Sequence, residues 1–229
     1  MSLFPFHFRT YLFALAVALA FRAVVGERES GTLKLRLGLP ATKRDVLLAE
    51  LVSRLSLVVV TLLPLFVVLG VLMSSVYGGI PLVAFGLTAG WLLFYTSVWT
   101  TFVVGVSAAF TSPFRVLAAI CGTYLFFSPV TRIWDMVVMC LFSLVFAGSL
   151  TIPSLNAAAT GNSPAWFLYV EWLNPIHTLI WVGEWITSLK DTAVPMGELS
   201  LLFFSIGALV ILGGGALFVG YVRFQRVDL

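Results

Sequence analysis

The residues that could take part in chemistry gather in one short charged segment between two apolar runs. Residues 27–32 read Glu-Arg-Glu-Ser-Gly-Thr, and residues 40–50 hold Pro40, a basic pair and two more acids. Thr42 precedes Asp45 by three residues, the spacing of a capping box, in which side chains and backbone exchange hydrogen bonds at a helix start. The segment therefore predicts a charged turn followed by a helix, whose side chains can make ionic contacts with a lipid surface or a protein.

The predicted helix is amphipathic. We place Lys43, Arg44 and Glu50 on its polar face and Val46, Leu47, Leu51 and Leu55 on its apolar face. Such a helix can lie in a membrane interface and also bind a soluble protein through its charged side. A loop that its basic residues anchor to anionic lipid is the competing interpretation, and the residues alone leave both open.

Other kinds of chemistry find no support in the residue pattern. The two histidines, His7 and His177, lie far apart, and no His-Glu-x-x-His pattern occurs. Cys121 and Cys140 lie in apolar runs and form neither a metal-ligand spacing nor a disulfide framework. The loop that binds nucleotide phosphates, Gly-x-x-x-x-Gly-Lys followed by Ser or Thr, is absent as well. We therefore expect no catalytic residue, no metal and no cofactor bound by this chain.

The elements that position the charged segment must lie in a membrane. Hydrophobic residues make up 60% of the 229 residues and charged residues 10%, whereas soluble domains carry about 25% charged residues. A soluble fold of this size could not cover so much apolar side chain, but a lipid bilayer accepts it. The net charge of +3 is too small to indicate binding to nucleic acid. We predict an all-α polytopic membrane protein with a single domain over residues 1–229.

Five apolar runs are candidates for crossing a bilayer, at about 20 residues per helix. They cover residues 11–25, 55–73, 82–110, 116–134 and 199–222. Residues 136–152 continue the fourth run, and we interpret them as an outer-leaflet or re-entrant helix. The sequence therefore predicts about five transmembrane helices.

Basic residues predict the orientation of these helices, because cytoplasmic loops carry an excess of Lys and Arg. Ten of the 13 basic residues flank the charged segment, the turn after the third run or the C-terminus: Arg22, Arg28, Lys34, Arg36, Lys43, Arg44, Arg54, Arg115, Arg223 and Arg226. Residues 26–54 are therefore predicted to form a cytoplasmic loop and helix, with the N-terminus outside. Four crossings after this loop return the chain to the cytoplasm.

Residues 153–197 are predicted to lie at the outer surface of the membrane. The segment is crowded with aromatic residues, which prefer the headgroup zone: Trp166, Tyr169, Trp172, Trp181 and Trp185. We expect one or two short interfacial helices here. Just before this segment, Arg132 and Asp135 have the spacing to pair on one helix near the outer interface. A role in a path across the membrane is the alternative for this pair.

Two pairs of small residues indicate close contact between helices. Gly86 with Gly90, and Ala216 with Gly220, each stand four residues apart within an apolar run. Small residues at this spacing let two membrane helices approach closely. The contact would lie either within one chain or between two copies.

The charged segment closely resembles the cytoplasmic loop of type-2 ABC transporter permeases. In that family Glu-Arg-Glu-x-Gly-Thr precedes a leucine-rich turn, a proline, a basic pair and a helix entering the membrane, and residues 27–50 follow this order. Leu-Asn-Pro at residues 173–175 and Gly-Tyr-Val-Arg-Phe at residues 220–224, before a terminal Asp-Leu, match an outer motif and the C-terminus of the family. The resemblance covers nearly the whole chain and points to the subgroup of the nitrous-oxide-reductase maturation permease.

The resemblance implies the permease subunit of an ABC exporter, driven by ATP that a separate subunit hydrolyses. ATP and Mg²⁺ would bind to that ATP-binding partner, and the charged segment would be the coupling element that contacts it. The coupling residues would be Glu27, Arg28, Glu29, Ser30, Gly31, Thr32, Pro40, Lys43, Arg44, Asp45 and Glu50. A second permease copy, identical or related, would complete the transporter. The membrane would be a prokaryotic cell membrane. The sequence does not indicate the substrate. An intramembrane enzyme or a membrane scaffold that does not transport is the alternative.

The sequence departs from the family pattern in two places. Residues 33–37 alternate between Leu and basic residues, a period that by itself indicates a strand. The resemblance implies a helix there, which we adopt. Family members usually have six spans, whereas here the charged segment follows a single apolar run. We therefore expect that an upstream hairpin is missing, through either a late start or a shortened variant.

The predicted orientation can be tested by cysteine labelling in intact cells, in a variant with Cys121 and Cys140 replaced by serine. An impermeant maleimide added outside should label Glu184→Cys and should spare Glu27→Cys and Lys43→Cys until the membrane is opened. The expectation rests on the distribution of basic residues. Labelling of Glu27→Cys from outside would overturn the topology.

Overall fold

The computed structural model describes residues 6–32, 42–150, 164–188 and 196–226, and these are entirely helical or in turns. The helices follow one another as α1 Phe6–Ala20, α2 Val25–Glu29, α4 Lys43–Tyr77, α5 Leu82–Ala109, α6 Pro113–Phe127, the π-helix η1 Trp134–Met139, α7 Cys140–Ala147, α9 Ala165–Trp172, α10 Pro175–Ser188 and α11 Met196–Arg226. The prediction of an all-α membrane protein is confirmed.

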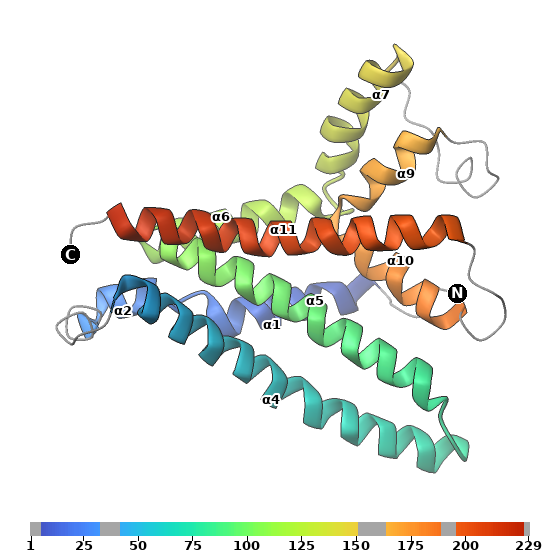
Figure 1. The fold of residues 1–229 in the computed structure, drawn as a ribbon, viewed down its shortest axis with the longest axis horizontal. Helices are drawn as coiled ribbons and strands as arrows, with labels where there is room; N and C mark the ends of the chain where they lie inside the picture. Colours follow the sequence, from blue (N-terminus) through green and yellow to red (C-terminus); the bar gives the residue numbers. More distant parts are fainter. Residues whose placement is uncertain (1–5, 33–41, 151–163, 189–195, 227–229) are drawn as a thin grey trace.

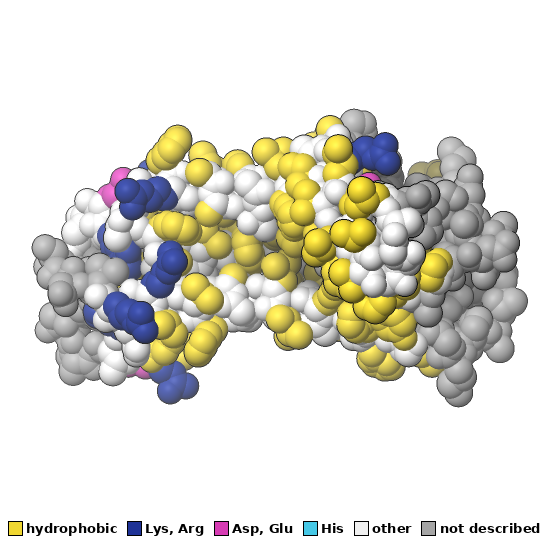
Figure 2. Space-filling model, turned by 90° about the horizontal axis from the view of Figure 1, so that it is seen from above, with side chains coloured by type: hydrophobic (Ala, Val, Ile, Leu, Met, Phe, Trp, Pro, Cys, Tyr) yellow, Lys and Arg dark blue, Asp and Glu magenta, His cyan; other side chains and the backbone are white. Residues whose placement is uncertain are grey.

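The long helices α1, α4, α5 and α11 extend along the long axis of the molecule (Figure 1). Helix α5 contacts the other three. Helix α2, the start of α4 and the end of α11 lie together at one end, and α7 and α9 project from the side of the bundle, away from that end (Figure 1). Most of the basic side chains visible from above gather at the end that holds α2 (Figure 2). We call this the basic end.

Four helical stretches are long and apolar enough to cross a membrane: Thr10–Glu29, Lys43–Tyr77, Leu82–Ala109 and Leu199–Arg226. They contain the first, second, third and fifth predicted spans. The fourth predicted span, residues 116–134, differs, because α6 ends at Phe127 and the shorter apolar helix Trp134–Ala147 follows after a turn. The 15 residues of α6 extend about 22 Å at 1.5 Å per residue, less than a bilayer core of about 30 Å.

The break after α6 has a local cause. Pro129 has no backbone N–H, and its ring disfavours a helical conformation at Ser128, whose backbone is extended with φ −70° and ψ 131°. The hydroxyl of Thr131 donates a hydrogen bond to the carbonyl of Ser128 at 3.0 Å and closes the turn. Arg132 then adopts a positive φ of 53° before the helix resumes. The fourth predicted span is therefore not a single helix, because α6 ends at Phe127 and η1 begins only at Trp134.

Helix α4 begins at the predicted capping box and continues without interruption for 35 residues. The amide of Asp45 donates to the hydroxyl of Thr42 at 3.2 Å, and the amide of Thr42 donates to the carboxylate of Asp45 at 3.0 Å. Pro64 lies inside the helix, which membrane helices tolerate because neighbouring groups satisfy the freed carbonyl. The charged helix start and the second span are thus one continuous helix, as predicted.

Helix α5 is the centre of the fold. Of the 18 consecutive residues that form the most apolar part of α5, 72% are buried. The corresponding share for α4 is 11%. Tyr95, Trp99 and Phe102 stack edge to face along α5 with ring centroids 5.5–6.3 Å apart. Phe13 of α1 packs against Trp99 with centroids 4.8 Å apart. Among the four stretches long enough to cross a membrane, α4 has the smallest buried share, so it offers the most apolar surface to lipid or to another membrane chain.

Helices α5 and α11 approach so closely at one place that only glycine fits. A Cβ built on Gly105 would lie 2.4 Å from the carbonyl carbon of Ala216, and one on Gly220 would lie 2.2 Å from the carbonyl oxygen of Gly105. The pair Ala216 and Gly220 therefore lies at a contact within this chain. A Cβ on Gly86 or Gly90, in contrast, would have no atom of the described residues within 4 Å.

This contact predicts that Gly220→Ala destabilises the permease although alanine favours a helix. The added methyl must displace backbone atoms of Gly105, and overpacking of this kind costs about 1–3 kcal/mol. At about 2–4 °C per kcal/mol for a chain of this size, the midpoint of thermal unfolding in detergent should fall by several degrees.

Gly215→Ala in the same helix is the matched control. Its Cβ would meet no atom within 4 Å, so this variant should gain helix propensity and unfold no earlier than wild type. Equal midpoints for Gly220→Ala and Gly215→Ala would contradict the close approach.

Candidate functional site

The basic end brings together the charged segment and the ends of two central helices. Helix α2 and the start of α4 contribute residues on either side of the undescribed residues 33–41, and α5 and α11 contribute their last turns. Exposed arginines surround this end: Arg22, Arg44, Arg115, Arg223 and Arg226. The candidate site is therefore assembled from parts of the chain that are far apart in sequence.

Ser107 of α5 fixes where α2 begins. Helix α1 ends at Ala20, and the chain turns before it becomes helical again at Val25. The buried hydroxyl of Ser107 accepts hydrogen bonds from the backbone amides of Val24 and Val25, both at 3.1 Å. Amides at a helix start lack partners within the helix, and this hydroxyl satisfies two of them. The sequence interpretation missed Ser107, because a serine within an apolar run carries no distinctive signal.

Arg28 points into the bundle and joins three helices. Its guanidinium donates hydrogen bonds to the carbonyls of Phe110 at 3.1 Å and Ala108 at 3.2 Å, at the end of α5. The same group lies 5.0 Å from the centre of the Phe224 ring of α11, within the range of a cation–π contact. The predicted coupling residue Arg28 is thus engaged inside the protein, where it holds α2 against α5 and α11.

The rest of the Glu-Arg-Glu-Ser-Gly-Thr motif runs from α2, which holds Glu27 and Glu29, into the residues after it, and Glu29, Ser30 and Thr32 are exposed. Glu29 pairs with Arg22 at 2.7 Å across the turn between α1 and α2. The hydroxyl of Ser30 donates to the carbonyl of Glu27 at 3.3 Å and lies 2.9 Å from that of Thr32.

Gly31 follows with a φ of +74°, and a Cβ there would have no atom of the described residues within 4 Å. Glycine is therefore favoured at position 31 by its backbone conformation and not by lack of space, because the left-handed conformation is costly for most other residues. Pro40 and the helix predicted over residues 33–37 lie outside the described residues.

Lys43 joins the start of α4 to the end of α11. Its ammonium donates to the carbonyl of Gln225 at 3.1 Å and lies 5.9 Å from the centre of the Phe224 ring. A polar hollow opens between the two helix ends, lined by Thr42, Lys43, Arg44, Asp45, Tyr221 and Gln225. Arg44 and Asp45 are exposed at this hollow, so they are available to a partner from the aqueous side.

Glu50 lies on the buried face of α4, and its assignment to the polar face is wrong. It is 6% exposed and accepts a hydrogen bond from Nε of Arg54 at 3.1 Å. Arg54 also donates to the carbonyl of Leu19 in α1 at 3.1 Å. Glu50 stands four residues after Val46 and three after Leu47, so helical geometry puts all three on one face. A buried carboxylate is tolerated there because it is paired.

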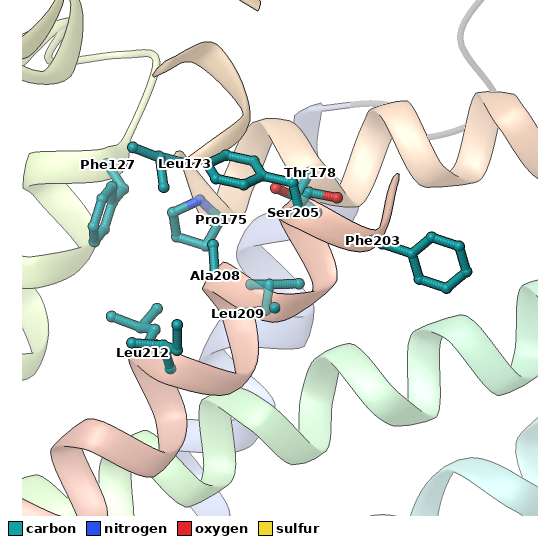
Figure 3. A pocket seen from close by; sticks show the side chains of 12 residues that line it. Phe127, Leu173, Pro175, Thr178, Phe203, Ser205, Ala208, Leu209 and Leu212 are labelled. Atoms are coloured by element: carbon teal, nitrogen blue, oxygen red, sulfur yellow. The ribbon is translucent and has the colours of Figure 1, made fainter. Parts of the chain in front are cut away.

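The opposite half of the bundle contains an apolar hollow of about 430 Å³. Its lining comes from α6, from the turn between α9 and α10, and from α11, and includes Phe127, Leu173, Pro175, Leu209 and Leu212 (Figure 3). The hydroxyls of Thr178 and Ser205 also line it, but Thr178 donates to the carbonyls of Trp172 in α9 and of Asn174, and Ser205 donates to that of Leu202 in its own helix. The lining is uncharged, so this hollow can hold hydrocarbon and offers no group for chemistry.

Asn174 holds the turn between the short helices α9 and α10. Its side-chain amide donates to the carbonyl of Phe127 at 3.0 Å, and its side-chain oxygen accepts from the amide of Ile176 at 3.0 Å. The Leu-Asn-Pro motif thus connects these two helices to the end of α6. In the segment that follows α6, Arg132 and Asp135 form an ion pair of 3.7 Å, with the Arg132 side chain 72% exposed.

Within the described residues, no group of three or more His, Cys, Asp or Glu side chains could hold a metal ion. The cations Arg28 and Lys43 of the basic end donate to backbone carbonyls of α5 and α11.

Comparison with known protein families matches residues 4–229 to the model of the ABC-2 family transporter protein. No curated protein matches the sequence at a significant level. Because the family match spans nearly the whole chain, the protein belongs to the ABC-2 transporter family and is an integral membrane permease subunit of an ABC transporter.

Proposed function

We propose that this permease works in an ATP-driven exporter and that its basic end receives the ATP-binding subunit. The observation that carries the proposal is the attachment of the charged segment to the span ends, through Arg28 on one side and Lys43 on the other. A partner that moves this segment would move the spans with it. ATP and Mg²⁺ would reside on the partner, since this sequence has no phosphate-binding loop.

Helix α4 has the properties needed to carry motion into the membrane. It is continuous from its cap at Thr42 to Tyr77, so a displacement at the exposed residues Arg44 and Asp45 tilts the whole helix. It packs against α5 and touches α1 and α11, but only 11% of the residues in its most apolar 18-residue stretch are buried, so other helices of the described chain do not enclose it. The pairing of Glu50 with Arg54, which binds the carbonyl of Leu19, provides a pivot against α1 near the basic end.

The wider assignment has four further parts, each a hypothesis. The direction of transport is outward, a second permease copy completes the path, and the membrane is the prokaryotic cell membrane. The subgroup is that of the nitrous-oxide-reductase maturation permease. The predicted outer segment, residues 153–197, would lie opposite the partner. The alternative is an intramembrane enzyme or a membrane scaffold that does not transport.

The first test reverses two charges of the motif. The double variant Glu27→Lys and Glu29→Lys should reduce both co-purification of an ATP-binding-cassette subunit and the stimulation of its ATP hydrolysis. Exposed ion pairs contribute about 0–1 kcal/mol each, so a several-fold loss is expected.

Arg132→Gln, a charge change at the opposite end, should leave co-purification at the wild-type level. A folded Glu27→Lys, Glu29→Lys permease that binds and stimulates the ATPase as wild type would remove the main support for this docking site.

The second test uses the left-handed backbone of Gly31. Gly31→Val should weaken co-purification and lower the unfolding midpoint, because left-handed backbone costs a β-branched residue about 1–2 kcal/mol. Gly31→Asn adds a side chain of similar size, but asparagine tolerates this conformation. This variant should therefore keep more of the co-purification and a higher unfolding midpoint than Gly31→Val. If the two variants were indistinguishable, the φ of Gly31 would have no bearing on coupling.

A further inference from the structure

We infer that Phe224 is the junction through which movement of the charged segment reaches α5 and α11. The inference rests on the proposed function, because it names the route by which the same site acts. Phe224 lies in the last turn of α11, in the C-terminal motif that the docking proposal leaves without a role.

The burial of Phe224 is unusual for its place in the chain. Its side chain is 0% exposed, although it stands two residues before the end of α11. Its neighbours Arg223, Gln225 and Arg226 are all exposed. A large ring buried in the final turn of a charged helix end requires other elements to cover it, and helices α2 and α4 each place a cation against it.

Those two cations come from the two sides of the charged segment. The guanidinium of Arg28 lies 5.0 Å from the ring centre and the ammonium of Lys43 lies 5.9 Å from it. A cation within about 6 Å of an aromatic face is attracted by the negative potential of the ring. One ring therefore binds the segment both before and after residues 33–41, and a displacement of either side acts on α11.

The junction continues into α5 by two routes. Arg28 also binds the carbonyls of Ala108 and Phe110 at the end of that helix. Gly220, one turn before Phe224, lies against Gly105 with no space for a Cβ. Close-packed surfaces transmit displacement because they leave no void to absorb it. Helices α5 and α11 should therefore move as a pair when the charged segment moves.

This role requires an aromatic ring and not merely a buried apolar side chain. Leucine at position 224 would keep most of the burial but would present no negative face to Arg28 and Lys43. Tyrosine would keep the ring. The comparison of Phe224→Leu with Phe224→Tyr thus separates cation binding from filling of the core.

The first measurement uses the purified permease alone in lipid nanodiscs and follows amide hydrogen exchange. Phe224→Leu should speed exchange in α2 and in the first turn of α4 by about fivefold, the scale that cation–π contacts support. Phe224→Tyr should match wild type. Phe167→Leu, which removes a buried ring from the separate cluster around Trp134 and Met139, should leave exchange at the basic end unchanged.

The second measurement adds the ATP-binding-cassette subunit that co-purifies with wild type and separates binding from coupling. Phe224→Leu should still bind that subunit, because the exposed residues of the charged segment remain. Its stimulation of ATP hydrolysis should fall by about fivefold, and Phe224→Tyr should restore it.

The outcomes distinguish this inference from the proposed function. If the wild-type chain binds no ATP-binding subunit, the proposed function fails and the route fails with it, whatever the exchange data show. If wild type binds and stimulates the subunit but Phe224→Leu equals Phe224→Tyr in exchange or in stimulation, docking stands and the Phe224 route is overturned. Faster exchange and lost stimulation with retained binding, both reversed by tyrosine, support the route.

Discussion

The close approach of α5 and α11 at Gly105 and Gly220 is the constraint on which the rest of the structure depends. Backbone atoms of the two helices meet there without intervening side chains. Lipid tails are as apolar as the side chains, so the hydrophobic effect does not drive membrane helices together, and van der Waals packing holds this pair. The residues that follow each glycine are therefore placed with little freedom. Ser107, Ala108 and Phe110 follow Gly105, and Phe224 follows Gly220, so the basic end is built directly on this contact.

Hydrogen bonds at the basic end join the end of α5 to α2 in both directions. The end of α5 exposes carbonyls that its own helix cannot use, and Arg28 donates to two of them. The start of α2 exposes amides, and Ser107 accepts from two of those. Each hydrogen bond gives a partner to a polar group that would be costly to bury unpaired. The charged segment is consequently part of the helix bundle, and a partner that contacts it contacts the spans.

The two halves of the molecule differ in what they can do. At the basic end the hollow beside Arg44 and Asp45 is polar and open, which suits a soluble partner. In the other half the hollow beside Leu209 and Leu212 is apolar, which suits hydrocarbon. Helix α11 lines both hollows, through Tyr221 and Gln225 at the basic end and through Leu209 and Leu212 in the other half. This division matches a permease that receives motion on one side and responds within the membrane.

The sequence by itself determined the features that depend on neighbouring residues. Apolar length predicted the long spans, and the spacing of Thr42 and Asp45 predicted the cap of α4, because both rest on interactions within one helix. Only the tertiary structure decided which face or partner a residue meets. Gly86 with Gly90 and Ala216 with Gly220 read alike, yet a second helix of the described chain lies only against the latter pair. Arg28 turns inward because the carbonyls of a helix 80 residues away lie beside it, and no local pattern encodes that position.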